Sequence, residues 1–267
     1  MRSMASSEKP TQQDLISEEE LLSSEMTLLG HFDELRDRLI KSFIAIVATT
    51  FVVAAFTEQI LKILIAPYSR GDEGPVIHVF EPTESISVFF RVALTGGLIL
   101  AMPYLIYHVL MFILPGLEEN EKRYVVWGVP AATFLFSTGV AFAWFLLIPT
   151  AIGFLSTWQN DTFEPTWQAQ KYIPFVTSLI FWIGVSFETP LIIFIMAKLG
   201  LVTPRFLVQQ WRFAVIIIAI IAALITPTID PFNMALVMFP LIILYGLSIL
   251  LAYVAQIGRA KNSAEST

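Results

Sequence analysis

Six apolar blocks, most of them about as long as a membrane is thick, follow one another along this sequence and are separated by short polar or charged segments. A helix needs about 20 apolar residues to cross the hydrocarbon core of a bilayer, which is roughly 30 Å thick. Lipid offers no hydrogen-bond partners, so the backbone N–H and C=O groups of each block must bond to one another, as they do in a helix. The pattern predicts an all-α membrane protein with six transmembrane helices.

The fifth apolar block has only 13 residues. We expect the last two helices to be short. As a helix the fifth block reaches only about 20 Å, so the bilayer beside it would be thinned, which makes a polar cavity that admits water to Glu188 plausible. The segment 60–65 predicts a short helix at the membrane interface. The predicted spans are residues 40–57, 92–114, 124–148, 173–197, 213–225 and 234–254.

Three regions are predicted along the chain. Residues 1–27 are polar and acidic, which is typical of a disordered tail. Residues 28–257 form the transmembrane domain, and its first turns, 28–39, have one apolar face that suits the membrane surface. Residues 258–267 form a polar cytoplasmic tail.

Lysine and arginine fall mainly on one side of the predicted spans. With the N-terminus inside, twelve lie on inner segments and four on outer ones. Cytoplasmic loops carry such an excess, so both ends of the chain are predicted to be cytoplasmic. The inner residues are Arg2, Lys9, Arg36, Arg38, Lys41, Lys122, Arg123, Lys198, Arg205, Arg212, Arg259 and Lys261, and the outer ones are Lys62, Arg70, Arg91 and Lys171.

The composition argues against several classes of function. Hydrophobic residues make up 56% of the chain and charged residues 14%, against about 25% charged in soluble domains. There is no cysteine, and the three histidines are scattered, so neither a thiolate nor a histidine metal site is expected. The sequence has no GxSxG, HExxH or glycine-rich phosphate loop. We therefore expect no enzyme activity, no cofactor, no metal and no nucleic-acid partner.

Glu188 stands within the fourth predicted span, between Gly184 and Pro190. A charged side chain at the centre of a bilayer costs at least about 2.5 kcal/mol, which makes it a functional hypothesis by default. The simpler interpretation is a protonated or hydrogen-bonded glutamate that joins two helices, and the sequence favours neither. A secondary transporter of a small ion or solute could use Glu188 as its site, although no internal repeat supports that reading.

Two further glutamates lie on predicted cytoplasmic segments. Glu34 is accompanied by Arg36 and Arg38 where the first span begins, and Glu121 by Arg123 at the end of the first inner loop. On spacing alone, Glu34 is explained as part of a solvated helix face. The basic residues beside Glu121 are explained if they orient the chain in the membrane, but this does not account for Glu121 itself. If folding brings the two carboxylates together, they form a fork for guanidinium groups, because the planar donors of arginine pair bidentately with carboxylates.

Asp230 lies in the predicted outer turn between the last two helices. Its short acidic side chain favours an Asx turn or a helix cap at that place. A Gly96-Gly97 pair inside the second span predicts close helix packing.

Short motifs in order along the chain carry a resemblance to a known family. They are His31 to Leu39, Ala66-Pro67, Pro82-Thr83-Glu84, Pro103, Glu121-Lys122-Arg123, Gly184 to Pro190, and Thr226-Pro227 followed by Asp230. In this combination, over roughly residues 28–257, the chain resembles the TatC family, the receptor component of the twin-arginine protein translocase.

The resemblance implies a receptor in the prokaryotic cytoplasmic membrane. Such a protein binds twin-arginine signal peptides of folded passengers, works in an oligomeric complex with single-span TatB-like and TatA-like proteins within the membrane lipid, and uses the proton-motive force. The resemblance assigns signal recognition to Glu34 and Glu121, beside Arg36 and Arg123. Its membrane-buried glutamate matches Glu188, and its aspartate between the last helices matches Asp230. The matching prolines are Pro67 in the outer loop and Pro103 in the second span.

A purely structural scaffold is the third reading. It would leave Glu34 and Glu121 dispensable.

Overall fold

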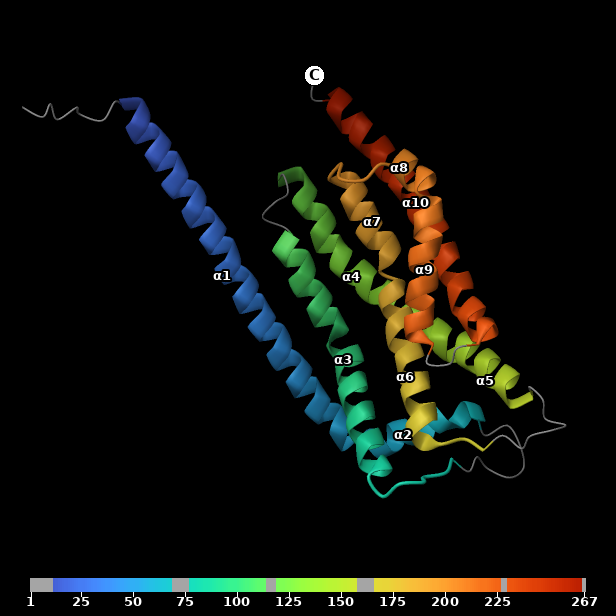
Figure 1. Ribbon diagram of the computed structural model, residues 1–267. Helices are drawn as coiled ribbons and strands as arrows, with labels where there is room; N and C mark the ends of the chain where they lie inside the picture. The colour runs from blue at the N-terminus through green and yellow to red at the C-terminus, as the bar shows by residue number, and fades with distance from the viewer. Residues whose placement is uncertain (1–11, 69–76, 114–118, 158–165, 227–229, 266–267) are drawn as a thin grey trace, which may run out of the picture. The chain divides into compact units, whose positions relative to one another are not determined.

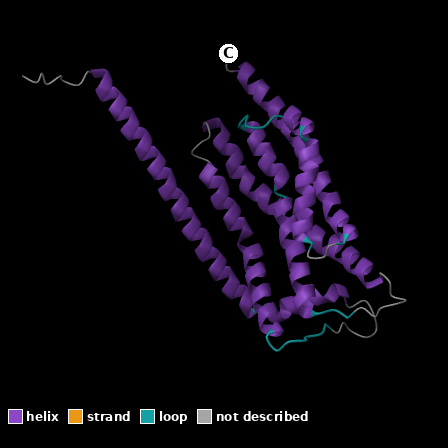
Figure 2. Ribbon diagram, viewed as in Figure 1, coloured by secondary structure: helices purple, strands orange, loops and turns teal. Residues whose placement is uncertain are grey.

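The computed structural model describes residues 12–68, 77–113, 119–157, 166–226 and 230–265 (Figure 1). The chain divides into two compact units, Met1–Ile44 and Ala45–Thr267. Within the described residues every regular element is a helix, and no strand is present (Figure 2). A single parallel bridge joins His78 to Gln168. The predicted all-α class is therefore confirmed.

The first unit holds the beginning of helix α1, Gln12–Ala55. This helix reaches back into the segment for which a disordered tail was predicted, and so shortens that tail. The reason is local, because residues 12–29 contain no glycine or proline and are rich in Glu, Gln and Leu, which favour helix. Residues 1–11 lie outside the described part of the chain, and for them the tail stays a prediction.

The second unit contains the remaining helices. Among the described residues, five helical segments are long and apolar enough to cross a membrane, at 32–55, 84–112, 128–157, 169–198 and 231–257, and one shorter helix, α9, is apolar. The first of these segments begins in the first unit. The helices are α2 Thr57–Ile65, α3 Glu84–Ile113, α4 Glu119–Phe142, α5 Ile148–Thr157, α6 Ala169–Ser186, α7 Thr189–Lys198, α8 Pro204–Gln209, α9 Trp211–Ile225 and α10 Pro231–Glu265, with a π-helical turn Ala143–Leu147 between α4 and α5.

The structure agrees with the prediction for the short helix near residue 60 and only in part with the prediction for the last two helices. The short helix expected at 60–65 is present as α2. The expectation that both final helices are short holds for α9, with 15 residues, and is wrong for α10, with 35. Helix α10 continues beyond the apolar block because residues such as Gln256, Arg259 and Lys261 are good helix formers.

Helix α6 lies at the centre of the second unit. Its most deeply buried residues recur every three or four positions, which places them along the helix as one broad face. They pack with buried residues of α3, α5 and α10, such as Val92, Ile148 and Val237. The residues of this face are Tyr172, Ile173, Val176, Leu179 and Ile183.

The end of α1 packs closely on α3. A Cβ atom on Gly97 would lie 2.5 Å from Thr50 Oγ1 and 2.6 Å from Thr50 Cα. The close approach lets the Thr49 hydroxyl donate a hydrogen bond to the Gly97 carbonyl at 2.8 Å. The predicted packing role of this glycine is confirmed, since any larger side chain would separate the two helices.

Candidate functional site

The fourth predicted span is interrupted at Glu188. Helix α6 ends at Ser186 and α7 begins at Thr189. Pro190 has no N–H to continue the helical ladder, and its ring clashes with the carbonyl four residues before. The chain tightens here, and the Glu188 N–H donates to the Val185 carbonyl at 3.0 Å. The local sequence thus sets a break in the middle of a membrane span.

Glu188 is buried, with only 6% of its surface exposed. Its carboxyl group lies beside the backbone of Phe136 on α4. The Oε1 atom has no hydrogen-bond partner among the described residues. An unsatisfied polar atom at this depth costs several kcal/mol, so a purely structural role leaves this oxygen unexplained.

Two glycines allow α4 to approach the break. A Cβ atom on Gly139 of α4 would lie 2.8 Å from Phe187 Cγ, and one on Gly184 of α6 would lie 2.8 Å from Phe136 Cε2. The rings of Phe142 and Phe187 pack at 5.6 Å between centroids. The glycines hold Glu188 against α4.

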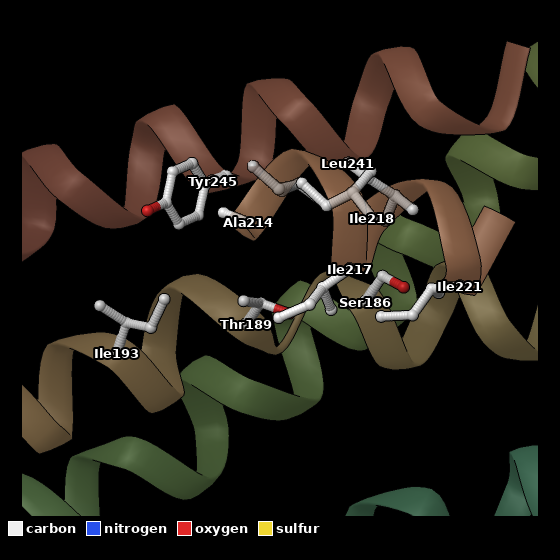
Figure 3. A pocket seen from close by; sticks show the side chains of 10 residues that line it. Ser186, Thr189, Ile193, Ala214, Ile217, Ile218, Ile221, Leu241 and Tyr245 are labelled. Atoms are coloured by element: carbon white, nitrogen blue, oxygen red, sulfur yellow. The ribbon is translucent and has the colours of Figure 1, made fainter. Parts of the chain in front are cut away.

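A cavity of about 240 Å³ opens on the other side of the break (Figure 3). Ser186 and Thr189 of the break contribute hydroxyl groups, and isoleucines of α9 face them. The sequence suggested a polar cavity that admits water to Glu188 beside the short fifth span. This cavity adjoins α9, but most of its lining is apolar and Glu188 is not part of it, so it is not the predicted one. The lining residues are Ser186, Thr189, Ile193, Ala214, Ile217, Ile218, Ile221, Leu241, Leu244 and Tyr245.

Asp230 caps α10. Its Oδ1 atom accepts the Asn233 backbone N–H at 2.7 Å, and its Oδ2 atom accepts the Asn233 side-chain amide at 2.9 Å. An acidic N-cap satisfies an unpaired N–H and complements the helix dipole. The predicted cap is confirmed.

Glu84 is a residue to which sequence reasoning assigned no role. It is fully buried, and its carboxylate accepts the backbone N–H of Phe80 at 2.9 Å and that of Gln170 at 2.6 Å. Gln168, the N-cap of α6, makes no side-chain cap of its own. Glu84, at the start of α3, therefore caps α6 from another helix. The only sequence signal was its place in the Pro82-Thr83-Glu84 motif.

The same end of the unit, here called the α2 end, is tied together by further bonds. The His78 N–H donates to the Trp167 carbonyl at 2.9 Å, and the Ala169 N–H donates to the His78 carbonyl at 3.0 Å. The Tyr172 hydroxyl donates to the Leu64 carbonyl at the end of α2, at 2.9 Å. Figure 1 shows α2 running crosswise at the level where α3 and α6 begin. Pro67 lies in the 3₁₀ turn that follows α2, Ala66–Tyr68.

The candidate recognition residues lie on α1 and α4. The Arg38 guanidinium donates through Nε to Glu34 Oε1 at 2.9 Å, and through Nη2 to the same atom. Arg36 is exposed and pairs with Asp33 at 3.4 Å. Glu121 and Arg123 lie in the first turns of α4, and their side chains are outside the described part. The fork of two carboxylates stays a prediction.

Pro103 lies inside α3, which continues through it. Among the described residues, no three His, Asp or Glu side chains are grouped so that they could hold a metal ion.

Comparisons with known proteins agree on one family. The family profile described as "Sec-independent protein translocase protein (TatC)" matches residues 30–240. A protein of Deinococcus radiodurans with that name is 36% identical over 237 residues, covering 86% of this chain and 87% of the relative. One of Desulforapulum autotrophicum is 37% identical, covering 88% and 86%. A crystal structure described as "Twin Arginine Translocase Receptor- TatC" aligns with a TM-score of 0.78 at 31% identity, over 84% of this chain and 99% of that chain.

Proposed function

Because this chain belongs to the TatC family and is a multi-pass membrane component of the Sec-independent translocase, we propose that it is the receptor subunit for twin-arginine signal peptides. It binds such a signal at the cytoplasmic face and mediates export of the folded passenger, driven by the proton-motive force. TatB-like and TatA-like single-span proteins join it in an oligomeric complex.

The observation that carries this proposal is the pairing of Glu34. Its carboxylate accepts two N–H groups of one guanidinium, that of Arg38. A carboxylate that binds arginine within its own helix has the chemistry needed to bind an arginine of a signal peptide. Glu121 supplies the second carboxylate of the proposed fork, and Arg36 and Arg123 adjust the charge around it.

The six-span topology, with both ends in the cytoplasm, is part of the proposal. In the part of the chain that the structure describes, five segments are long and apolar enough to span, and the shorter apolar helix α9 is proposed as the sixth span. We expect reporter fusions at positions 75, 165 and 229 to read outside, and those at 118, 205 and 262 to read inside, because the basic residues favour that orientation. A C-terminal fusion that reads outside would show that α9 does not cross.

Loss of either recognition glutamate should weaken signal binding. One hydrogen bond to a charged partner is worth about 1.5–3 kcal/mol, so Glu34→Ala or Glu121→Ala should reduce binding by roughly ten- to a hundredfold. Photo-crosslinking of a twin-arginine signal peptide to membranes measures this. High salt should weaken the wild-type interaction as well.

The crosslinking experiment has two matched controls. A twin-lysine peptide keeps the charge and loses the planar donors. The variant Asp37→Ala removes an exposed acid from the same part of α1, one that pairs with Lys41 at 2.6 Å, and should bind normally. A scaffold predicts no difference between the two peptides. Unchanged crosslinking in both glutamate variants contradicts the assignment.

A transporter of small ions or solutes is the competing function. It needs a polar path to Glu188, yet this side chain is buried and the neighbouring cavity is lined mainly by isoleucine and leucine. The geometry therefore favours the receptor.

A further inference from the structure

Arg91 is a cation within a membrane-spanning helix that the function proposed above does not use. It is the eighth residue of α3, about 10 Å along the helix from Glu84 at 1.5 Å per residue. The side chain is exposed. Its Nη2 atom donates to the Ser178 hydroxyl of α6 at 3.1 Å. Arg91 and Ser178 thus meet across the groove between two packed helices.

The protein supplies little to balance this charge. Within the described residues, Arg91 has no carboxylate in ion-pair distance, and Ser178 is its one hydrogen-bond partner. A guanidinium has five N–H donors. An arginine inside a span pairs with another group or extends toward the interface, because the bare charge is costly in hydrocarbon.

The direction of α3 takes Arg91 toward one interface. Side chains on a helix lean toward its N-terminus, which for α3 is the α2 end. Helix α2 carries an exposed Glu58–Lys62 pair at 2.7 Å on one side and buries Leu64 on the other, as a helix at the level of the lipid headgroups does. The guanidinium therefore extends from within the span toward the headgroup layer.

Below the guanidinium, toward the middle of the bilayer, the same helix faces are apolar. Leu94 lies one turn after Arg91 and is 58% exposed, and Trp182 lies one turn after Ser178 and is 46% exposed. The groove thus has a cation at the depth of the headgroups and an apolar surface nearer the middle of the bilayer. A phospholipid has the complementary arrangement, with its phosphate at headgroup depth and its acyl chains nearer the middle.

We propose that Arg91 and Ser178 bind the phosphodiester group of a phospholipid in the α3–α6 groove. The guanidinium pairs with two phosphate oxygens, the Ser178 hydroxyl donates a third hydrogen bond, and an acyl chain lies along Leu94 and Trp182. Because the cation has no carboxylate partner, the site prefers a lipid with net negative charge, such as phosphatidylglycerol, over phosphatidylcholine. The proposal does not depend on signal-peptide binding.

Native mass spectrometry of the purified full-length protein, offered equal amounts of phosphatidylglycerol and phosphatidylcholine, tests the site. One cation near the membrane surface changes anionic lipid binding by about fivefold, so Arg91→Gln should lose about that much preference for phosphatidylglycerol. Arg91→Lys keeps the charge and loses the planar donors, and should retain part of it. The thermal midpoint of each variant confirms that it is folded.

Two controls define the site. Lys62→Gln removes a cation at the same end, already paired with Glu58, and should keep the wild-type preference. Excess inorganic phosphate should not displace the lipid. The proposal is overturned if Arg91→Gln keeps the full preference, if Lys62→Gln loses as much, or if free phosphate displaces the lipid, which would reveal a site for soluble anions. If Arg91→Gln fails to fold, equal binding by Arg91→Lys and Ser178→Ala to that of the wild type overturns it.

Discussion

Replacing Glu84 with leucine should strongly destabilise the α2 end of the second unit. The carboxylate is fully buried and accepts the N–H groups of Phe80 and Gln170. Without it, two partly buried N–H groups lose a charged acceptor, and a hydrogen bond to a charged group is worth about 1.5–3 kcal/mol. We expect a clearly lower thermal unfolding midpoint in detergent and faster amide exchange at the first turn of α6.

Two variants sharpen that experiment. Glu84→Gln retains one side-chain oxygen that can accept a hydrogen bond, and should fall between the wild type and Glu84→Leu. Glu81→Leu changes an exposed acid three residues away, and should leave both measurements unchanged. If Glu84→Leu unfolds at the wild-type midpoint, the carboxylate is not what holds α3 to the start of α6.

The second large effect is expected at Glu188 and separates two stages of transport. Glu188 lies at a break within a span and has a buried oxygen without a described partner. In the proposed topology it lies ten residues before Lys198, the cytoplasmic end of its span, and so too deep to meet arginines at the cytoplasmic surface. We therefore expect it to act after the signal has bound, by providing a polar group to a partner segment inside the bilayer. Glu188→Leu should slow export of a folded passenger about tenfold or more, the value of one hydrogen bond to a charged or strongly polar partner.

Export and signal-peptide crosslinking should be measured in the same membranes, with the protein level as a control. Glu188→Gln keeps the shape and hydrogen-bonding capacity of a protonated glutamate and should be mild. Ser186→Ala changes a hydroxyl at the same break, one that donates to the Trp182 carbonyl at 2.7 Å, and should export normally. Wild-type export by Glu188→Leu would mean that the residue is tolerated packing. Loss of peptide binding first would assign it to recognition.

Features that depend on neighbouring residues could be predicted from the sequence. The lengths of the apolar blocks predict membrane-spanning helices, because backbone N–H and C=O groups in lipid must form their hydrogen bonds within the protein, and few structures other than a helix achieve this. Asp230 caps α10 through Asn233, three residues away, so its role was readable from its position in a turn. Gly97 predicts close packing because a glycine on a transmembrane helix lets the backbone of a second helix approach closely.

The tertiary structure alone decided which distant groups meet. The acceptor for Gln170 is Glu84, 86 positions away in the chain, and no local pattern reveals a cap supplied by another helix. Glu188 could be placed within a span from the sequence, but its position beside α4, away from the cavity between α7, α9 and α10, depends on how Gly139 and Gly184 let the helices cross. The physical reason is the distance along the chain over which each interaction acts. Helix formation and capping by a nearby side chain involve residues within one or two turns. The pairing of buried polar groups depends on how several helices pack, which no single segment determines.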